Sequence, residues 1–292
     1  MISRKAPEQQ SARSRWWNTD LSDLKAVQAA IQTIQPSHIY HLASLVSGSR
    51  ALDMMLPTLQ SNFMTAFNVL LATTEAGSGK IILAGSLEEP DADAQVPCSP
   101  YAAAKGSASA YARTFHALYQ TQTVIARIFM TYGPAQSDQT KLIPYVTTSM
   151  LKGVSPKLSS GARLIDWIYV DDVVDGLLAC GQSNSAVGCT VDIGSGKLVS
   201  IRDLVHTLRA AIPDAPTPRF GAIPDRPLER VTKADVDHSY KLIGWRPTFD
   251  LSEGLRRTIE WYRADLRVSS SVQTDSLNSY RGQQKALKIH SD

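Results

Sequence analysis

The sequence predicts an α/β protein with a doubly wound parallel sheet and a smaller C-terminal lobe. Three observations lead to this class. Strand-like and helix-like patterns alternate along the first half of the chain, the strand-like runs are almost entirely apolar, and the pattern changes after Pro134. Alternating elements with apolar strands are typical of a parallel sheet covered by helices on both faces. We therefore expect one domain over residues 1–134, a partly interleaved second lobe over 135–268, and a disordered polar tail over 269–292.

In the first half of the chain, the spacing of apolar residues predicts the helices and strands, and residues such as Pro36 and Gly77 mark where helices end. Helices are expected over 24–34, 56–76 and 101–119, and strands over 38–43, 81–84 and 123–129. In the second half we expect helices over 141–151, from 171, 201–212 and 251–266, and strands over 167–170 and 190–193. Active sites of such sheets lie at the C-terminal ends of the strands. Ser86 and the segments after Ala43 and Phe129 should meet there.

Composition excludes several classes of protein. The net charge is only +3, and no basic run is interleaved with aromatic residues, so nucleic-acid binding is not expected. Three scattered cysteines without C-x-x-C spacing indicate neither a disulfide framework nor a metal site. No apolar run reaches the roughly 20 residues of a membrane helix, and the N-terminus lacks a signal-peptide core. We expect a cytoplasmic protein without a membrane partner.

Tyr101 and Lys105 form a Y-x-x-x-K pair on an Ala-rich helix that follows Pro100. The i, i+4 spacing places the phenol and the ammonium on one helix face, where the cation favours the phenolate. The hydroxyl of Ser86, at a strand end, can hydrogen-bond the same substrate oxygen. These three residues suit proton transfer to or from an alcohol or ketone. The alternative is a surface helix on which a tyrosine and a lysine occur by chance.

A series of segments, taken in order, resembles the extended short-chain dehydrogenase/reductase family, in its NAD(P)-dependent nucleotide-sugar epimerase/dehydratase branch. The likeness reaches to about Tyr262 and implies a Rossmann-like fold. The matching segments are Asp20–Leu21, His41–Ser44, Asn62, Ser86, Tyr101 with Lys105, Arg127–Phe129 with Tyr132–Pro134, Trp167–Asp172, Arg226–Pro227 and Leu242–Pro247.

The resemblance implies roles for individual residues. Ser86, Tyr101 and Lys105 would be catalytic, and Lys105 would also hydrogen-bond the nicotinamide ribose. The other cofactor contacts implied are Asp20 and Leu21 beside the adenine, Leu42, Ala43 and Ser44 along the phosphates and ribose, and Asn62 and Phe129 near the nicotinamide. The implied partner is a nucleotide-diphosphate sugar, and a homodimer would form through the helices over 56–76 and 101–119.

Three positions bear on the substrate. Arg226 would pair with its diphosphate, Met130 replaces the family's asparagine, and Glu88 matches a glutamate of the 4,6-dehydratases. Their aspartic acid is replaced by Leu87, so the resemblance implies a 4-ketoreductase or an epimerase rather than a dehydratase.

The largest departure lies at the front of the chain. The family's G-x-x-G-x-x-G turn is missing, and the first glycine is Gly48. We therefore expect the sequence to begin about 30 residues late relative to a whole βαβ unit, with its first βα unit missing. Ser3 and Arg4 then fall where the family selects its cofactor, and an arginine there favours NADP over NAD. The missing turn also supports an alternative function, a non-catalytic relative that cannot bind the cofactor.

Several other residues have simpler interpretations. Asp20 could serve only as a helix cap for the segment from Leu24, and His41 is expected to be a hydrogen-bonded strand histidine. Asp171 and Asp172 are expected to cap a helix rather than bind a metal. Arg163 and Arg230 read as surface charges.

Overall fold

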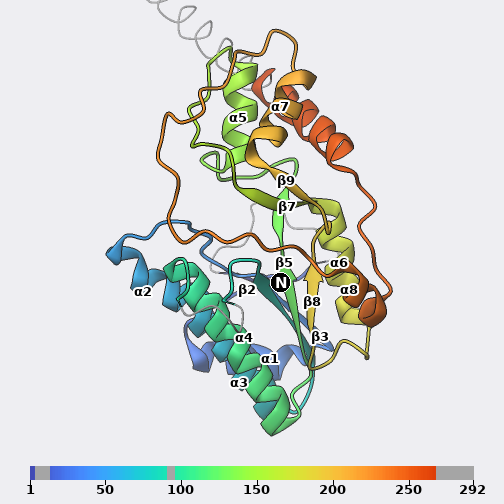
Figure 1. The fold of residues 1–292 in the computed structure, drawn as a ribbon. Helices are drawn as coiled ribbons and strands as arrows, with labels where there is room; N and C mark the ends of the chain where they lie inside the picture. The colour runs from blue at the N-terminus through green and yellow to red at the C-terminus, as the bar shows by residue number, and fades with distance from the viewer. Residues whose placement is uncertain (4–13, 91–95, 268–292) are drawn as a thin grey trace, which may run out of the picture. The chain divides into compact units, whose positions relative to one another are not determined.

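The computed structural model describes residues 1–3, 14–90 and 96–267 (Figure 1). The chain divides into two compact units, each assembled from separate segments. The first unit comprises Met1–Thr131, Leu164–Leu198 and Arg226–Thr248, and the second comprises Tyr132–Arg163, Val199–Asp225 and the residues from Phe249 onward. Their assignment to cofactor and substrate stays a prediction. The tail expected over 269–292 lies outside the described residues.

The first unit contains a four-stranded sheet in which every neighbouring pair is parallel, as predicted. The strand order is β3 (His38–His41), β4 (Lys80–Ser86), β5 (Thr123–Ile128), β8 (Thr190–Ile193). The register places Ser86 opposite Ile128 and Ile128 opposite Ile193. Three strands therefore end at the same level, and the segments that follow them share one edge of the sheet.

Alternating residues of β4 are buried on opposite faces of the sheet, which explains why the whole strand is apolar. Ile81 and Leu83 pack with α1 (Leu24–Ile34), α3 (Thr65–Ala76) and α4 (Pro100–Tyr119). Ile82 packs with α6 (Val170–Gln182) on the other face. Figure 1 shows α1, α3 and α4 gathered on one side of these strands and α6 with α8 (Val236–Ile243) on the other.

Side-chain caps fix where the helices of the first unit begin. The Asp23 carboxylate accepts the amide of Ala26 (3.2 Å), so Asp23 caps α1. The suggestion that Asp20 is this cap is wrong, because its carboxylate accepts the amide and hydroxyl of Ser22 instead. Ser99 caps α4 by accepting the amide of Ala102 (3.1 Å), and Pro100 follows at the first helical position. This cap determines where the first turn of α4, and thus Tyr101, begins.

The helix expected over 56–76 is interrupted by a π-helical segment. A 3₁₀ turn, η1 (Leu52–Met54), leads into α2 (Met55–Thr58), the π segment η2 (Leu59–Met64) and then α3. Apolar periodicity does not distinguish a single π turn from α-helix, so the sequence could not reveal it. Such turns occur frequently at functional sites, and η2 carries Asn62.

The remaining elements are shorter. β1 (Ile2–Ser3) pairs in parallel with β2 (Trp17–Asn18), and a three-stranded sheet has the order β6 (Met130–Tyr132), β7 (Leu164–Tyr169), β9 (Leu198–Ser200). The second unit contains α5 (Leu142–Leu151), α7 (Ile201–Ala211) and a helix over 251–267. The strands β2, β6 and β9 and the helix α8 were not predicted. Among the described residues, no helix has the length and apolar character needed to cross a membrane.

Candidate active site

Ser86 and Tyr101 meet at the carboxyl end of β4. Ser86 is the last residue of that strand, and Tyr101 lies in the first turn of α4. Both side chains are buried. Burial raises the pKa of the phenol, and the nearby hydroxyls of Ser86 and Ser44 act against that shift. The strand end, the helix start and the loop after β3 thus converge on one phenolic oxygen.

Lys105 lies one helical turn after Tyr101 and is also buried. Its Nζ donates a hydrogen bond to the carbonyl oxygen of Ala84 (2.7 Å) and lies 5.9 Å from the centroid of the Tyr101 ring. The ammonium is therefore anchored to the backbone of β4 beside the phenol.

The acid–base properties of the pair differ from the expectation. Burial raises the pKa of Tyr101 to about 12, and the negative charges of Glu88 and Glu89 add to this effect. Burial also lowers the pKa of Lys105 to about 8, and the charge of Glu89 opposes that shift. The expected lowering of the phenol pKa by Lys105 is absent because desolvation of the phenolate dominates. At neutral pH Tyr101 is a protonated phenol, which makes it a proton donor.

The residues after Ser86 form a tight turn that orients its hydroxyl. The amide of Glu88 donates to Ser86 Oγ (3.2 Å), which leaves the hydroxyl proton free to be donated toward the phenol oxygen. The amide of Glu89 donates to the Ser86 carbonyl oxygen (3.0 Å) and closes the turn. The Glu88 carboxylate accepts a long hydrogen bond from the Ser99 hydroxyl (3.4 Å), beside the start of α4.

Asn62 holds the loop that follows β3. Its Oδ1 accepts the Ser44 hydroxyl (2.7 Å) and the Leu45 amide (2.8 Å), while Nδ2 donates to the Leu45 carbonyl oxygen (3.1 Å). The buried amide therefore fixes Ser44, which in turn faces Tyr101. Leu42 and Ala43, just before it, are exposed. Their predicted contacts with the cofactor stay predictions.

His41 is a buried residue at the end of β3, and its Nε2 lies 3.2 Å from Thr65 Oγ1. Burial, together with the charge of Lys105, lowers the pKa of His41 to about 4, so the ring is neutral at physiological pH. Its Nδ1 has no hydrogen-bond partner among the described residues. The hydrogen bond to Thr65 agrees with the interpretation of His41 as a strand histidine.

Arg226 lies over the loop that follows β3. A Cβ added at Gly48 would come within 2.5 Å of its guanidinium, so the arginine occupies the space left by the missing side chain. Arg50, two residues later, donates to the carbonyl oxygens of Cys98 (2.9 Å) and Pro227 (2.7 Å). Arg226 is exposed and belongs to the same unit as Tyr101.

The other predicted substrate and nicotinamide contacts follow β5. Phe129 is buried in the core with Ala234, close to Gly194, and Met130, partly buried, begins β6. Nothing in these placements tests the predicted contacts.

The residues predicted to bind the adenine side lie at the front of the chain. Ser3 ends β1, whereas Arg4 lies outside the described residues. Asp20 is exposed, and Leu21 packs partly against the core. The residues around Tyr101 fit the ribose and nicotinamide half of a dinucleotide, with hydroxyl, amide and ammonium groups at a strand end. No glycine-rich turn precedes Gly48, so this sequence offers no such cradle for the diphosphate.

Asp172 has a structural role. Its Oδ1 accepts the amide (2.8 Å) and the hydroxyl (2.9 Å) of Thr248. Asp172 therefore links the first turn of α6 to Thr248, the last residue of the segment Arg226–Thr248. Within the described ranges, no group of His, Cys, Asp and Glu side chains could hold a metal ion. The expectation that Asp171 and Asp172 cap this helix is wrong, because the N-cap of α6 is Tyr169 and no side chain forms a cap hydrogen bond there.

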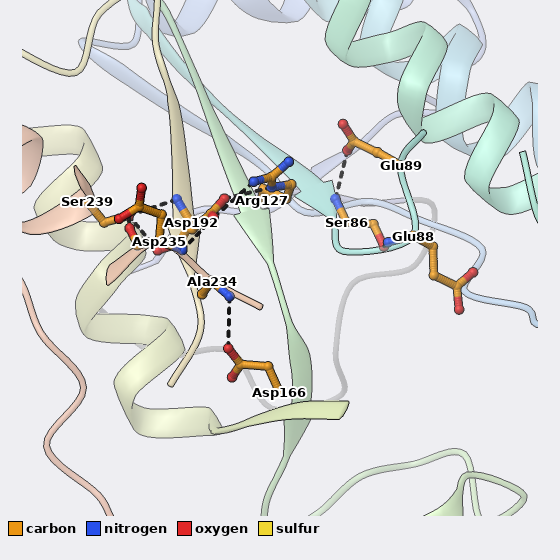
Figure 2. Close-up of polar contacts among 9 residues, drawn as sticks. All are labelled: Ser86, Glu88, Glu89, Arg127, Asp166, Asp192, Ala234, Asp235 and Ser239. Carbon is orange, nitrogen blue, oxygen red and sulfur yellow. Dashed lines mark hydrogen bonds and ion pairs between the residues drawn. The ribbon is translucent and has the colours of Figure 1, made fainter. Parts of the chain in front are cut away.

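Three carboxylates that accept backbone amides of the first unit were not predicted from the sequence (Figure 2). Asp192 forms a two-point ion pair with Arg127 (2.6 and 2.9 Å) and accepts the amide of Asp235 (2.9 Å). Asp166 accepts the amide of Ala234 (3.0 Å). The third, Glu89, accepts the amide of Ser86 (2.7 Å). The S-x-x-E pattern from Ser86 to Glu89 could have indicated this last contact.

Comparison with known proteins agrees with this fold. The model of the NAD dependent epimerase/dehydratase family matches residues 1–194. A UDP-glucuronate 4-epimerase from Thermodesulfobacterium geofontis is 24% identical over 273 residues, covering 90% of this chain and 83% of the relative. A dTDP-glucose 4,6-dehydratase from Mycobacterium tuberculosis is 30% identical over 266 residues, covering 84% and 76%.

Among solved structures, the UDP-glucose 4-epimerase of Thermotoga maritima has the same fold. Its TM-score is 0.80 at 22% identity, with 88% of this chain and 87% of that chain covered. The fold and the Ser–Tyr–Lys cluster define a short-chain dehydrogenase/reductase type of protein. The chain belongs to the NAD-dependent epimerase/dehydratase family.

Proposed function

We propose that this protein is a nucleotide-sugar 4-ketoreductase or epimerase that uses a nicotinamide dinucleotide. The observation that carries the proposal is the cluster of Ser86, Tyr101 and Lys105 at the carboxyl end of β4. Membership of the epimerase/dehydratase family supports it, as do the relatives named as a UDP-glucuronate 4-epimerase and a dTDP-glucose 4,6-dehydratase.

The proposed chemistry assigns each residue one task. Tyr101, protonated at neutral pH, donates its proton to the sugar carbonyl oxygen as that oxygen gains charge. Ser86 hydrogen-bonds the same oxygen and aligns it. Lys105 stabilises the phenolate that remains after transfer. A nicotinamide dinucleotide, when bound, would supply or accept the hydride at the sugar carbon. In the oxidising direction, which an epimerase also needs, the phenolate accepts the hydroxyl proton.

The cofactor contacts are part of the proposal. Asn62 fixes Ser44 toward the nicotinamide side, while Leu42, Ala43 and Phe129 complete that side and Asp20 and Leu21 flank the adenine. Arg4, beside Ser3, would favour NADP, whereas the name of the family refers to NAD. Comparing KM for NADPH and NADH tests the arginine hypothesis, and a clear preference for NADH would refute it.

The substrate contacts are proposed from the resemblance and from position. Arg226, exposed over Gly48, would pair with the diphosphate of the sugar nucleotide. Glu88 and Met130 would lie near the sugar. Replacement of the dehydratase aspartic acid by Leu87 favours reduction or epimerisation over dehydration.

An aromatic face on η2, α3 and α4 supports the proposed homodimer. Phe63, Phe67, Tyr111 and Phe115 form a chain of edge-to-face or tilted ring contacts with centroids 5.2 to 6.0 Å apart. Tyr111 is nevertheless 44% exposed. Sedimentation of the unaltered chain and of Tyr111→Glu tests this, since the charge should separate a dimer held by this face.

The test of function is an assay of the full chain with UDP- and dTDP-4-ketosugars and with the matching sugar nucleotides, in the presence of NADH or NADPH. Cofactor oxidation or C4 inversion that disappears in Tyr101→Phe supports the proposal. A second candidate, a non-catalytic relative, is favoured by one observation, the missing glycine-rich turn before Gly48. It predicts no turnover with any substrate and no calorimetric binding of dinucleotide.

A further inference from the structure

The proposed reaction leaves unused one acidic residue at the carboxyl end of β4. Glu89 is partly buried, three residues after Ser86, and its Oε1 accepts the Ser86 amide (2.7 Å). Figure 2 shows that the side chains of Glu88 and Glu89 point in opposite directions from the turn. Because Glu88 and Glu89 are adjacent but have different surroundings, the same substitution at Glu88 can serve as the control for a substitution at Glu89.

Opposite charges hold neighbouring peptide groups at this strand end. The Lys105 ammonium donates to the Ala84 carbonyl oxygen, and the Glu89 carboxylate accepts the Ser86 amide. Gly85, between them, leaves room for the carboxylate, since an added Cβ would lie 2.7 Å from Glu89 Oε1. Glu89 thus holds the peptide group that includes the Ser86 amide, and Lys105 holds the preceding peptide group through the Ala84 carbonyl oxygen.

The simplest alternative is a capping box, in which a glutamate three residues after a serine accepts its amide and only stabilises the turn. The surroundings of Glu89 go beyond that. Burial raises its pKa, while Ser109, the Ser86 amide, Lys105 and Arg127 act in the opposite direction. Its charge also acts on the buried ammonium of Lys105, and a carboxylate needed only for capping gains nothing from such a desolvated position.

We propose that Glu89 is a positioning residue, which fixes the peptide of Ser86 and supplies the negative charge that faces Lys105. This inference rests on the proposed function for its catalytic meaning, because Lys105 must stay an ammonium to stabilise the Tyr101 phenolate. The other charged or titratable groups around the two residues are Arg127 on β5, His41 on β3, and Tyr101 and Glu88 near the start of α4. Arg127 is paired with Asp192, and His41 is neutral near pH 7.

The test measures the titration of Lys105 directly in the full chain. Lysine labelled with ¹³C at Cε is followed by NMR from pH 6 to 10, and Lys105→Arg assigns the signal. Glu89→Gln keeps a side-chain oxygen for the Ser86 amide but removes the charge, so the midpoint for Lys105 should fall by about one pH unit. Glu88→Gln, the matched control, should leave that midpoint unchanged. Gly85→Ala, which displaces the carboxylate, should lower it as Glu89→Gln does.

Activity and stability separate the possible outcomes. If the midpoint falls from about 8 to about 7, the charged fraction at pH 8 falls about fivefold, and kcat at pH 8 should fall equally without a change in KM. Circular dichroism should show that Glu89→Gln is folded, because glutamine also completes a capping box. An unchanged Lys105 midpoint in Glu89→Gln overturns the inference. Because the midpoint needs no substrate, absence of turnover in the unaltered chain counts against the proposed function alone.

Discussion

The end of β4 and the front of the chain are built very differently, although both belong to the first unit. β4 has seven residues, all buried, lies between two parallel strands, and ends at Ser86 opposite Ile128 of β5. β1 and β2 have two residues each, and none of the four is buried. Ser86, proposed to align the substrate oxygen, therefore ends a fully buried strand, whereas Asp20 and Leu21, proposed for the adenine side, lie in the turn that follows the short strand β2. The chemistry should be more sensitive to substitution at the former than at the latter.

The largest effect is expected for Tyr101→Phe. It removes the proton donor but keeps the ring in its buried position, so turnover should fall by about 10²–10⁴-fold. Cofactor oxidation with a nucleotide 4-ketosugar measures this, and circular dichroism provides the control for folding. Turnover within twofold of the unaltered chain would contradict the assignment of Tyr101 as the acid.

The second prediction compares the two regions by stability. Leu83→Ala removes a side chain buried in the core between the sheet and α3, and should lower the free energy of unfolding by about 2–5 kcal/mol. Trp17→Ala in β2 removes a partly buried ring that stacks on Arg15, and should cost less than about 1 kcal/mol. Urea denaturation measures both. Equal losses would mean that the front strands are as firmly held as β4.

The regular strands and helices could be predicted well from the sequence, whereas the π segment and the helix caps could not. Apolar runs such as 81–84 and helical spacing over 24–34 report burial directly, and the parallel sheet followed from them. The π segment at Asn62 and the capping of α1 by Asp23 depend on local geometry that periodicity does not encode. Glu89 was missed for another reason. Its importance comes from Lys105, sixteen positions away, and only the fold brings the two near the same strand end.

The third prediction uses two buried asparagines that tie different loops. Asn62 holds Ser44 and Leu45 beside Tyr101, whereas Asn68 Nδ2 donates to the carbonyl oxygens of Leu21 (2.9 Å) and Ser22 (3.0 Å) at the front. Replacing either with alanine leaves buried or partly buried backbone groups unpaired and should cost about 1–3 kcal/mol of unfolding free energy. Only Asn62→Ala should also lower kcat, because only that loop carries Ser44. A similar loss of kcat in Asn68→Ala would place the front loop in the catalytic machinery.

The last prediction concerns pH. As the buried Lys105 loses its proton, kcat should fall with rising pH while its contribution to the free energy of unfolding rises. In ketone reduction kcat should stay nearly level up to about pH 7 and halve near pH 8, where Lys105 loses its proton, while Tyr101, with a pKa of about 12, remains protonated. Because the pKa of Lys105 is lowered on folding, the unfolded chain binds more protons between about pH 8 and 10.5. Lys105 therefore makes the free energy of unfolding rise with pH across that window.

Activity should thus decline while this contribution to stability increases, which separates loss of the ammonium from alkaline unfolding. Rate profiles and denaturant titrations of the unaltered chain and Lys105→Met measure the two trends. Lys105→Met should remove the rising contribution, and in Lys105→Arg, which stays charged, the decline near pH 8 should disappear. If the decline persists in Lys105→Arg, another group must titrate near pH 8. The buried ammonium could then no longer be the group that sets the alkaline limit of the reaction.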